Sequence, residues 1–275
     1  MKLQQYLYKF EAMTTPCEVL IASERKERAD ETAQAILQEA KRLEKKYSYY
    51  RPDSLLSALN ARTTQQLDME TRTLLQRAIG YYRRTGGVFD ITVATLKDLY
   101  TPQRDLMQLE REREKLQAYV GCGHLQIKRD RLYFDNPFTK IDLGGFVKEY
   151  AVDQAVRIAR KAKLRSVLVN FGGDIYALGR RSDGEKFRVG IKDPANPETY
   201  AAYVEIEDEA LATSASYARF ATIGGERFSH IIGADGGESP ASVTVIAANC
   251  VESGVYSTAM MIDPTLTTTN RVILL

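Results

Sequence analysis

Tryptophan is absent from the 275 residues, and cysteine occurs only three times. Cys17, Cys122 and Cys250 are odd in number, far apart and without C-x-x-C spacing, so neither a disulfide framework nor a zinc site is indicated. The formal net charge is only +2, which provides no broad basic field for nucleic acid. We therefore expect no disulfide-rich scaffold and no nucleic-acid partner.

The N-terminal segment, M-K-L-Q-Q-Y-L-Y-K-F, also lacks a long apolar stretch and a lipobox cysteine. A signal peptide needs an apolar core of about 7–15 residues, and a membrane-spanning helix needs about 20. We expect neither a signal peptide nor a membrane span. If Met1 is the native start, the protein is expected to be cytoplasmic; if the chain was trimmed, it is expected to be periplasmic.

The residues that are present are typical of a globular chain with a substantial core. Apolar residues make up 44% of the sequence and charged residues 27%. The length allows one large domain or two closely packed halves. Because no linker, low-complexity tract or short repeat is visible, we treat residues 1–275 as a single domain.

Hydrophobic periodicity and turn residues predict helices that do not alternate strictly with strands, which favours an α+β fold. The predicted helices are 26–47, a short one capped by Asp53 or Ser54, 70–84, 103–118 and 251–262. The predicted strands are 3–10, 17–22, 124–128, 131–134, 166–170, 186–192, 201–207, 209–213, 226–232, 243–247 and 272–275.

Residues 139–174 contain the strongest local signal for a ligand. A short strand is predicted to end at Asp142, two glycines then open a helix, and Lys148 lies in its first turn. Glycines allow close approach of a ligand, and the free N–H groups and dipole of a helix N-terminus favour an anion. A lysine there is unfavourable for the helix, so contact with a phosphate would explain it. The alternative is a tight strand-to-helix turn with a solvated lysine, which this short motif alone favours.

Seven short motifs occur in a characteristic order between Met13 and Thr258. They are Y-R-P-D-S-x-L-S-x-L-N, T-G-G-x-F-D-x-T-V, D-L-G-G-x-x-K-x-Y-A-V-D, N-x-G-G-D-I-Y-A, A-T-S-x-x-Y, S-H-I-I and S-T-A. This series resembles the ApbE family, the FAD:protein FMN transferases. The resemblance implies an α+β fold of T-fold type, with antiparallel sheets, packed helices and internal duplication.

The resemblance implies two ligands, FAD as substrate and Mg²⁺. It also implies a partner flavoprotein whose Thr or Ser hydroxyl, in a flavinylation motif, accepts FMN while AMP leaves. The alternatives are a divergent FAD-binding paralogue with little or no transferase activity, and an FAD pyrophosphatase.

By this resemblance, several positions are expected to bind the nucleotide. Met13 and Tyr50 are expected near the isoalloxazine, and Asp142 and Lys148 are expected to contact FAD, with Lys148 facing phosphate. The other expected contacts are Val88, Phe89 and Asp90 in the flavin wall and Ile232 near the adenosine. The structural alternatives are that Asp90 only caps the next helix and that Tyr50 belongs to the core.

The same resemblance places the metal at the carbonyl of Gly145 and at Ser257 and Thr258, and it suggests His230 or Asp235 as the base. His230 has a structural alternative as a satisfied strand histidine. A divalent cation bridging the diphosphate would neutralise charge during transfer.

The sequence departs from the family pattern at positions that affect this metal. Gly254 stands where the family has a metal-binding aspartate, and Mg²⁺ usually requires one or two carboxylates. Glu252 lies on another helix face and is a poor substitute. Glu149 replaces a glycine beside Lys148 and opposes FAD unless it points away or itself holds a cation. The sequence alone therefore predicts weak Mg²⁺ binding that Gly254→Asp would strengthen.

Overall fold

A seven-stranded antiparallel sheet forms the centre of the computed structural model, which describes residues 3–101, 105–196, 198–215, 220–223, 226–229 and 240–275. Its strands, in spatial order, are β1 (Gln4–Ala12), β2 (Thr15–Ser23), β5 (Ser166–Phe171), β6 (Asp174–Gly179), β9 (Glu209–Ala215), β12 (Ser242–Ala247) and β13 (Arg271–Leu274). Every neighbouring pair is antiparallel. The predicted α+β class with antiparallel sheets is confirmed, whereas the internal duplication and the single domain stay predictions.

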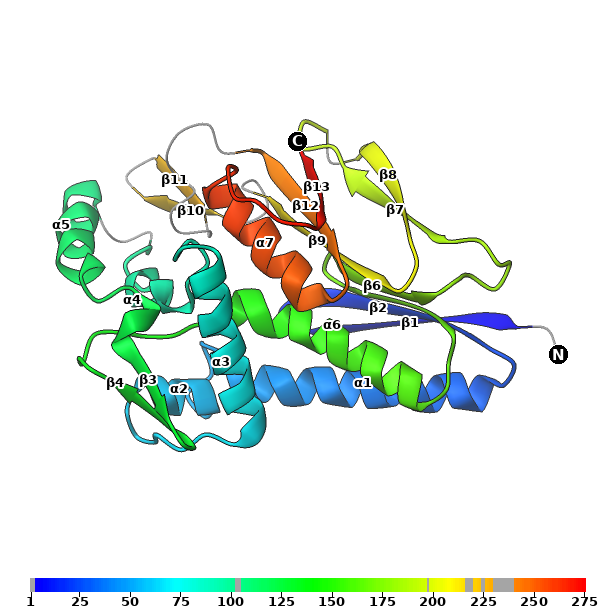
Figure 1. Ribbon diagram of the computed structural model, residues 1–275, viewed down its shortest axis with the longest axis horizontal. Helices are drawn as coiled ribbons and strands as arrows, with labels where there is room; N and C mark the ends of the chain where they lie inside the picture. Colours follow the sequence, from blue (N-terminus) through cyan, green and yellow to red (C-terminus); the bar gives the residue numbers. More distant parts are fainter. Residues whose placement is uncertain (1–2, 102–104, 197, 216–219, 224–225, 230–239) are drawn as a thin grey trace.

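Three helices cover this sheet: α1 (Lys26–Tyr47), α6 (Gly144–Lys161) and α7 (Cys250–Ile262). In Figure 1, α6 lies between α1 and α7, and it packs against both. Alanines at helical spacing on α1 and α6 are buried, including Ala29, Ala33, Ala151 and Ala155. Small side chains let neighbouring helices approach closely. On its other side, α6 packs directly against α7.

The remaining elements flank this layer, and most of them gather at the left of Figure 1. They are α2 (Leu55–Asn60), α3 (Met69–Arg84), η1 (Ile91–Val93), α4 (Ala94–Lys97), α5 (Leu106–Gln117), η2 (Cys122–His124), β3 (Leu125–Lys128), β4 (Arg131–Phe134), β7 (Phe187–Lys192), β8 (Tyr200–Ile206), β10 (Phe220–Ile223) and β11 (Glu226–Ser229). β3 and β4, both predicted as strands, pair with each other, and β7 pairs with β8.

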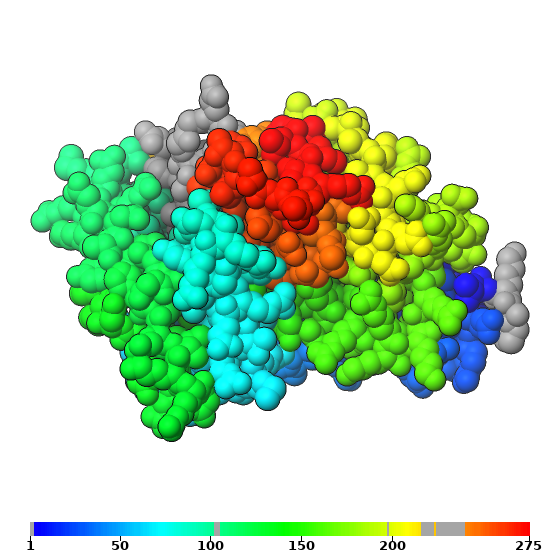
Figure 2. Space-filling model, viewed as in Figure 1, coloured from blue at the N-terminus to red at the C-terminus, as the bar shows by residue number. Residues whose placement is uncertain are grey.

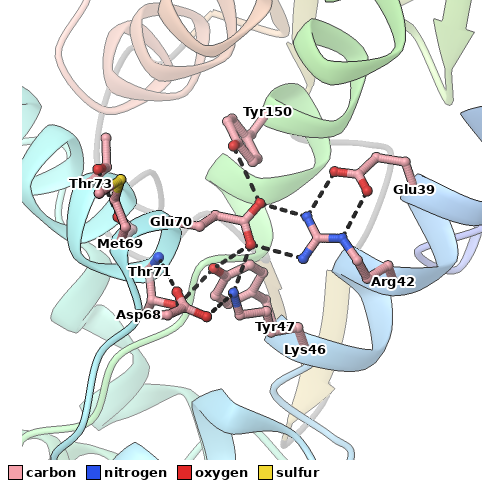
Figure 3. A network of polar contacts seen from close by, with 10 residues as sticks. All are labelled: Glu39, Arg42, Lys46, Tyr47, Asp68, Met69, Glu70, Thr71, Thr73 and Tyr150. Carbon is pink, nitrogen blue, oxygen red and sulfur yellow. Dashed lines mark hydrogen bonds and ion pairs between the residues drawn. The ribbon is translucent and has the colours of Figure 1, made fainter. Parts of the chain in front are cut away.

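A network of charged side chains ties α3 to α1 and α6 (Figure 3). The carboxylate of Glu70, on α3, accepts hydrogen bonds from Arg42 at 2.6 and 2.9 Å and from Lys46 at 2.7 Å. The hydroxyl of Tyr150, on α6, donates to Glu70 at 3.4 Å. Burial would raise the pKa of Glu70, but its two basic partners hold that pKa at about 2, below the usual 4.5. The charge of Glu70 therefore favours the folded state.

Two hairpin turns of the sheet lie next to each other. Met13 and Thr14 connect β1 to β2 with φ values of 54° and 58°, and Gly172 and Gly173 connect β5 to β6 with φ values of 62° and 98°. Two-residue turns with both φ positive match the twist of the flanking strands. A side chain on Gly172 would collide with the hydroxyl of Thr15, so this position requires glycine. The first turn lies slightly earlier than predicted, since Thr15 and Pro16 already belong to β2.

Two predictions about the central stretch need correction. The strand predicted to end at Asp142 is wrong, because residues 139–143 bond to loops and side chains instead of a neighbouring strand. The N–H of Ile141 donates to Asn60 Oδ1 at 2.9 Å, and the N–H of Asp142 donates to the carbonyl of Ile91 at 2.9 Å. The second error is an omission: β6 was not predicted, since five of its six residues are buried and it lacks the alternation of a half-exposed strand.

Candidate functional site

Asp90 lies in the turn after α3, where Gly86 and Gly87 have φ values of 62° and 90°. Its Oδ1 accepts hydrogen bonds from the N–H of Thr92 at 2.8 Å and from the Thr92 hydroxyl at 2.7 Å. Asp90 therefore caps η1, as the structural alternative proposed. The Cys122 thiol also donates to Oδ1, at 3.4 Å, and burial raises the pKa of the carboxyl despite these hydrogen bonds. Because these hydrogen bonds all use Oδ1 of this half-buried acid, Oδ2 is the oxygen that a ligand could contact.

Asp142 lies near Asp90, because its N–H donates to the carbonyl of Ile91, the residue that follows Asp90. Asp142 Oδ1 accepts from the N–H of Gly144 at 2.9 Å, and Oδ2 pairs with Lys97 at 2.5 Å. This carboxylate therefore occupies the N-terminus of α6. Burial would lower the pKa of Lys97, but the charge of Asp142 raises it overall.

Tyr50 lies beside the same lysine. Lys97 Nζ is 4.6 Å from the ring centre of Tyr50 and 4.6 Å from that of Tyr49. Tyr50 is 76% exposed, so its alternative assignment to the core is wrong. An exposed ring with a cation over its face is suited to stacking on a planar group. Sequence reasoning missed Lys97, which no motif marks.

The other positions expected at the flavin differ in exposure. Phe89 is buried, and its ring centre lies 6.1 Å from that of Phe146 on α6. Val88 is half-buried against the same core. Met13, in the β1–β2 turn, donates its N–H to Glu44 of α1 at 2.8 Å. Phe89 thus fixes the turn of Asp90 by packing, while Val88 and Met13 keep partly accessible side chains.

Lys148 pairs with Asp174, the first residue of β6. The Asp174 side chain is almost fully buried and the Lys148 side chain is 23% exposed. This ion pair explains how a cation is tolerated in the first turn of α6, where the helix dipole disfavours it. The sequence did not predict this ion pair, although Asp174 is the charged residue of the N-x-G-G-D-I-Y-A motif.

The hydroxyls expected at the metal lie together where α7 faces β9. Ser214 Oγ, on β9, is 3.0 Å from Ser257 Oγ and 3.2 Å from Thr258 Oγ1. Ser257 also donates to the carbonyl of Gly254 at 3.0 Å. Gly145 breaks the helical geometry at the start of α6, with φ −88° and ψ 22°. Ser214 belongs to the A-T-S motif but was not predicted at the site.

Gly254 and Glu149 occupy one point of contact between α7 and α6. A Cβ atom on Gly254 would lie 2.5 Å from Glu149 Cγ and 3.0 Å from Glu149 Oε1. The Glu149 side chain is 6% exposed, Oε1 is 3.8 Å from Lys148 Nζ, and Oε2 has no partner among the described residues. Glu149 therefore fills the space that a side chain at position 254 would need.

Glu252 is used elsewhere, as expected of a poor substitute ligand. Its carboxylate accepts hydrogen bonds from Asn249 and Asn270, each at 3.3 Å, beside the N-terminus of α7. Within the described part of the chain, no group of three or more His, Cys, Asp or Glu side chains is placed to hold a metal ion. Three predicted residues, His230, Ile232 and Asp235, lie outside the described residues.

Residues 13–269 match the model of the ApbE family. The chain belongs to the ApbE family. It is 29% identical over 227 residues to the FAD:protein FMN transferase of Vibrio cholerae, covering 78% of this chain and 68% of that one. It is 30% identical over 192 residues to the enzyme of that name from Escherichia coli K12, covering 65% of this chain and 55% of that one. The match thus spans about half the length of the Escherichia coli relative.

Solved structures of ApbE proteins share the fold. The crystal structure of an ApbE protein from Thermotoga maritima has a TM-score of 0.84 at 28% identity, covering 94% of this chain and 87% of that one. The flavin transferase ApbE from Vibrio cholerae has a TM-score of 0.86 at 24% identity, covering 99% and 93%. In the described ranges of this ApbE-family protein, every helix is too short or too polar to cross a membrane.

Proposed function

We propose that this ApbE-family protein is an FAD:protein FMN transferase. The observation that carries the proposal is the family match over residues 13–269. In the proposed reaction, a Thr or Ser hydroxyl of a partner flavoprotein attacks the FMN phosphorus of FAD. A phosphoester bond forms, the bond of that phosphorus to the bridging oxygen breaks, and AMP leaves with that oxygen. The hydroxyl proton passes to a base, for which His230 and Asp235 remain our candidates.

The geometry near the start of α6 supports a flavin site. Tyr50 offers an exposed ring, and Asp90 offers the carboxyl oxygen Oδ2, because its hydrogen bonds to Thr92 and Cys122 use Oδ1. Lys97 adds a positive charge beside Tyr50 and is held there by Asp142. A planar, polar ring system is the kind of group that such a stacking surface and acceptor would bind. Met13 and Val88 are proposed contacts at the same ring.

Lys148 is proposed to contact the diphosphate, although it already forms an ion pair with Asp174. The Lys148 side chain is 23% exposed, so an incoming phosphate could reach it. Asp174 would then orient Lys148 and offset its charge when no nucleotide is bound. Ile232 is proposed near the adenosine.

The available side chains fit Mg²⁺, which prefers hard oxygen ligands. The hydroxyls of Ser257 and Thr258 lie together, and the buried Glu149 oxygen has no partner among the described residues. With the Gly145 carbonyl, these are the residues that would hold the ion. When bound, Mg²⁺ would neutralise charge on the diphosphate as AMP departs. The protein groups would fix the phosphates and exclude water around them.

The test is a titration of the purified protein with FAD, FMN and AMP, followed by chromatography of the products after an acceptor flavoprotein domain is added. We expect FAD to bind best, with AMP appearing only alongside covalently bound flavin. Absence of FAD binding at tens of micromolar protein refutes the proposal. FAD binding without AMP supports the divergent paralogue instead, and AMP with free FMN supports the pyrophosphatase.

As a residue-level control, Asp90→Asn keeps an oxygen for capping η1, whereas Asp90→Ala removes the cap as well. If Asp90 contacts the ligand through Oδ2, both variants weaken FAD binding. If Asp90 is only a cap, Asp90→Asn binds FAD as the parent does.

A further inference from the structure

Glu149 is a buried acid with a long ion pair to Lys148 and with no hydrogen-bond donor to Oε2 among the described residues. Its side chain is only 6% exposed, yet Oε2 has no partner in the described ranges and Lys148 approaches Oε1 no closer than 3.8 Å. Lys148 instead pairs closely with Asp174. An ionised carboxylate in a buried site is strongly unfavourable unless a cation or donors compensate it. The ion pair with Lys148 is long and compensates this charge only weakly, so the position favours a ligand that supplies positive charge.

The neighbouring acid on α6 has no such deficit. Asp153, one turn further along, accepts the N–H of Cys250 at 2.8 Å and the N–H of Val251 at 3.3 Å, and so caps α7. Both carboxylates face α7, and of these two Glu149 is the one with an oxygen that no described residue satisfies. Capping of α7 thus explains why an acid is buried at position 153, but it does not explain the buried acid at position 149.

The facing helix is shaped around this carboxylate. Gly254 carries no side chain where a Cβ would lie 2.5 Å from Glu149 Cγ. The carbonyl of Gly254 accepts from Ser257, whose Oγ lies 3.0 Å from Ser214 Oγ. The Ser257 hydroxyl therefore lies within one helical turn of Gly254, where Glu149 contacts α7. A carboxylate combined with neutral hydroxyl and carbonyl oxygens is a donor set suited to a hard divalent cation.

We propose that Glu149 is the carboxylate ligand of the divalent cation in this protein. It reaches the site from α6 and takes the place of the aspartate expected at position 254 of α7. The two departures from the family pattern are then one change: the carboxylate moved from one helix to the other, and Gly254 makes room for it. This inference rests on the proposed function only for the role of the cation, since metal binding can be measured without turnover.

The experiment measures Mn²⁺ and Mg²⁺ binding to the full chain, by calorimetry for both ions and by the electron paramagnetic resonance of free Mn²⁺. Each ion is tested alone and with FAD. For Glu149→Gln we expect the affinity for either ion to fall by about tenfold or more, because loss of a ligand should weaken binding at least as much as loss of an outer partner. Glu252→Gln removes the same charge from α7 and is expected to bind as the parent does.

Two further variants separate ligation from folding. Gly254→Asp alone forces a second carboxylate against Glu149 and is not expected to improve binding. The exchange Glu149→Gly with Gly254→Asp returns the carboxylate to α7 and is expected to recover most of the affinity lost in Glu149→Gly. Circular dichroism of each variant checks the fold.

The melting temperature in EDTA gives an independent readout. Replacing a buried carboxylate whose ion pair with Lys148 is long by a neutral amide should raise the melting temperature of Glu149→Gln in EDTA, whereas the rise that Mg²⁺ causes in the parent should be lost. The proposal is overturned if Glu149→Gln binds Mn²⁺ within twofold of the parent, or if Gly254→Asp alone binds more tightly. FAD binding in EDTA reports the proposed function separately: its absence together with Glu149-dependent Mn²⁺ binding refutes the function and leaves this inference standing.

Discussion

Gly254→Ala is the simplest probe of the contact between α6 and α7. In an exposed helix interior, replacing glycine by alanine stabilises the protein by about 1 kcal/mol. At position 254 the added Cβ would lie 2.5 Å from Glu149 Cγ and 3.0 Å from Cδ, well inside contact distance. Overpacking of this kind costs about 1–3 kcal/mol. We therefore expect Gly254→Ala to be neutral or to destabilise the parent by about 2 kcal/mol at most, since the two effects oppose each other.

The same substitution should change sign when Glu149 is removed. In a Glu149→Ala background the collision is absent, so Gly254→Ala should stabilise by about 1 kcal/mol. The coupling energy between the two positions is then about 1–3 kcal/mol. The assay is urea denaturation of the four proteins in EDTA, so that metal binding does not contribute.

Gly80 provides a matched control within α3. A Cβ on Gly80 would meet nothing within 4 Å, so Gly80→Ala should stabilise by the propensity term alone, about 1 kcal/mol in either background. If Gly254→Ala stabilises the parent as much as Gly80→Ala does, Glu149 does not fill the space at position 254. That result would also remove the steric basis for the exchanged carboxylate.

Two further predictions concern charge and pH. The pKa of Glu70 is held at about 2, so its stabilising charge is fully present above the usual 4.5 and is lost as pH falls towards 2. Glu70→Gln should therefore destabilise by up to about 3 kcal/mol at neutral pH, and the gap to the parent should close across that window, as measured by urea denaturation from pH 7 to 3. Burial raises the pKa of Asp153 to about 6, against hydrogen bonds from Cys250 and Val251. Because the folded state then binds the proton more tightly, the contribution of Asp153 to the free energy of unfolding weakens as pH rises from about 4 to about 6. The melting temperature of Asp153→Asn should therefore fall less over this pH range than that of the parent. An equal fall in both proteins would contradict the raised pKa of Asp153.

The elements set by local pattern were predicted closely from the sequence. The predicted helix 26–47 has the bounds of α1, and Ser54, one of two proposed caps, accepts the N–H of Ser57 at the start of α2. Helical spacing and capping residues are local properties, so a single sequence displays them. The buried β6 and the false strand ending at Asp142 show the limit. β6 lacks the alternation of a half-exposed strand because five of its six residues are buried, and Ile141, before Asp142, bonds to Asn60, far away in the sequence.

The sequence predicted which residues belong to the candidate site, but it did not predict which residues they pair with. The motifs indicated Asp90, Asp142 and Lys148, yet nothing local shows that Lys97 holds Asp142 or that Asp174 holds Lys148. The contact of Glu149 with Gly254 joins residues over a hundred positions apart and depends on how α6 and α7 cross (Figure 2 shows the two helices, green and orange, close together on this face). The sequence therefore indicated that a carboxylate was missing at position 254, and only the structure showed where another one lies.

The measurement that tests the central claim most directly is flavin transfer itself, made with and without the exchanged carboxylate. The parent, Glu149→Gln and the exchange variant Glu149→Gly with Gly254→Asp are each incubated with FAD, Mg²⁺ and an acceptor flavoprotein domain, and covalent flavin and AMP are quantified. We predict equal amounts of covalent flavin and AMP from the parent, a loss of both in Glu149→Gln, and recovery in the exchange variant. Undiminished transfer by Glu149→Gln, or FAD that binds to the parent and stays intact, would contradict the account.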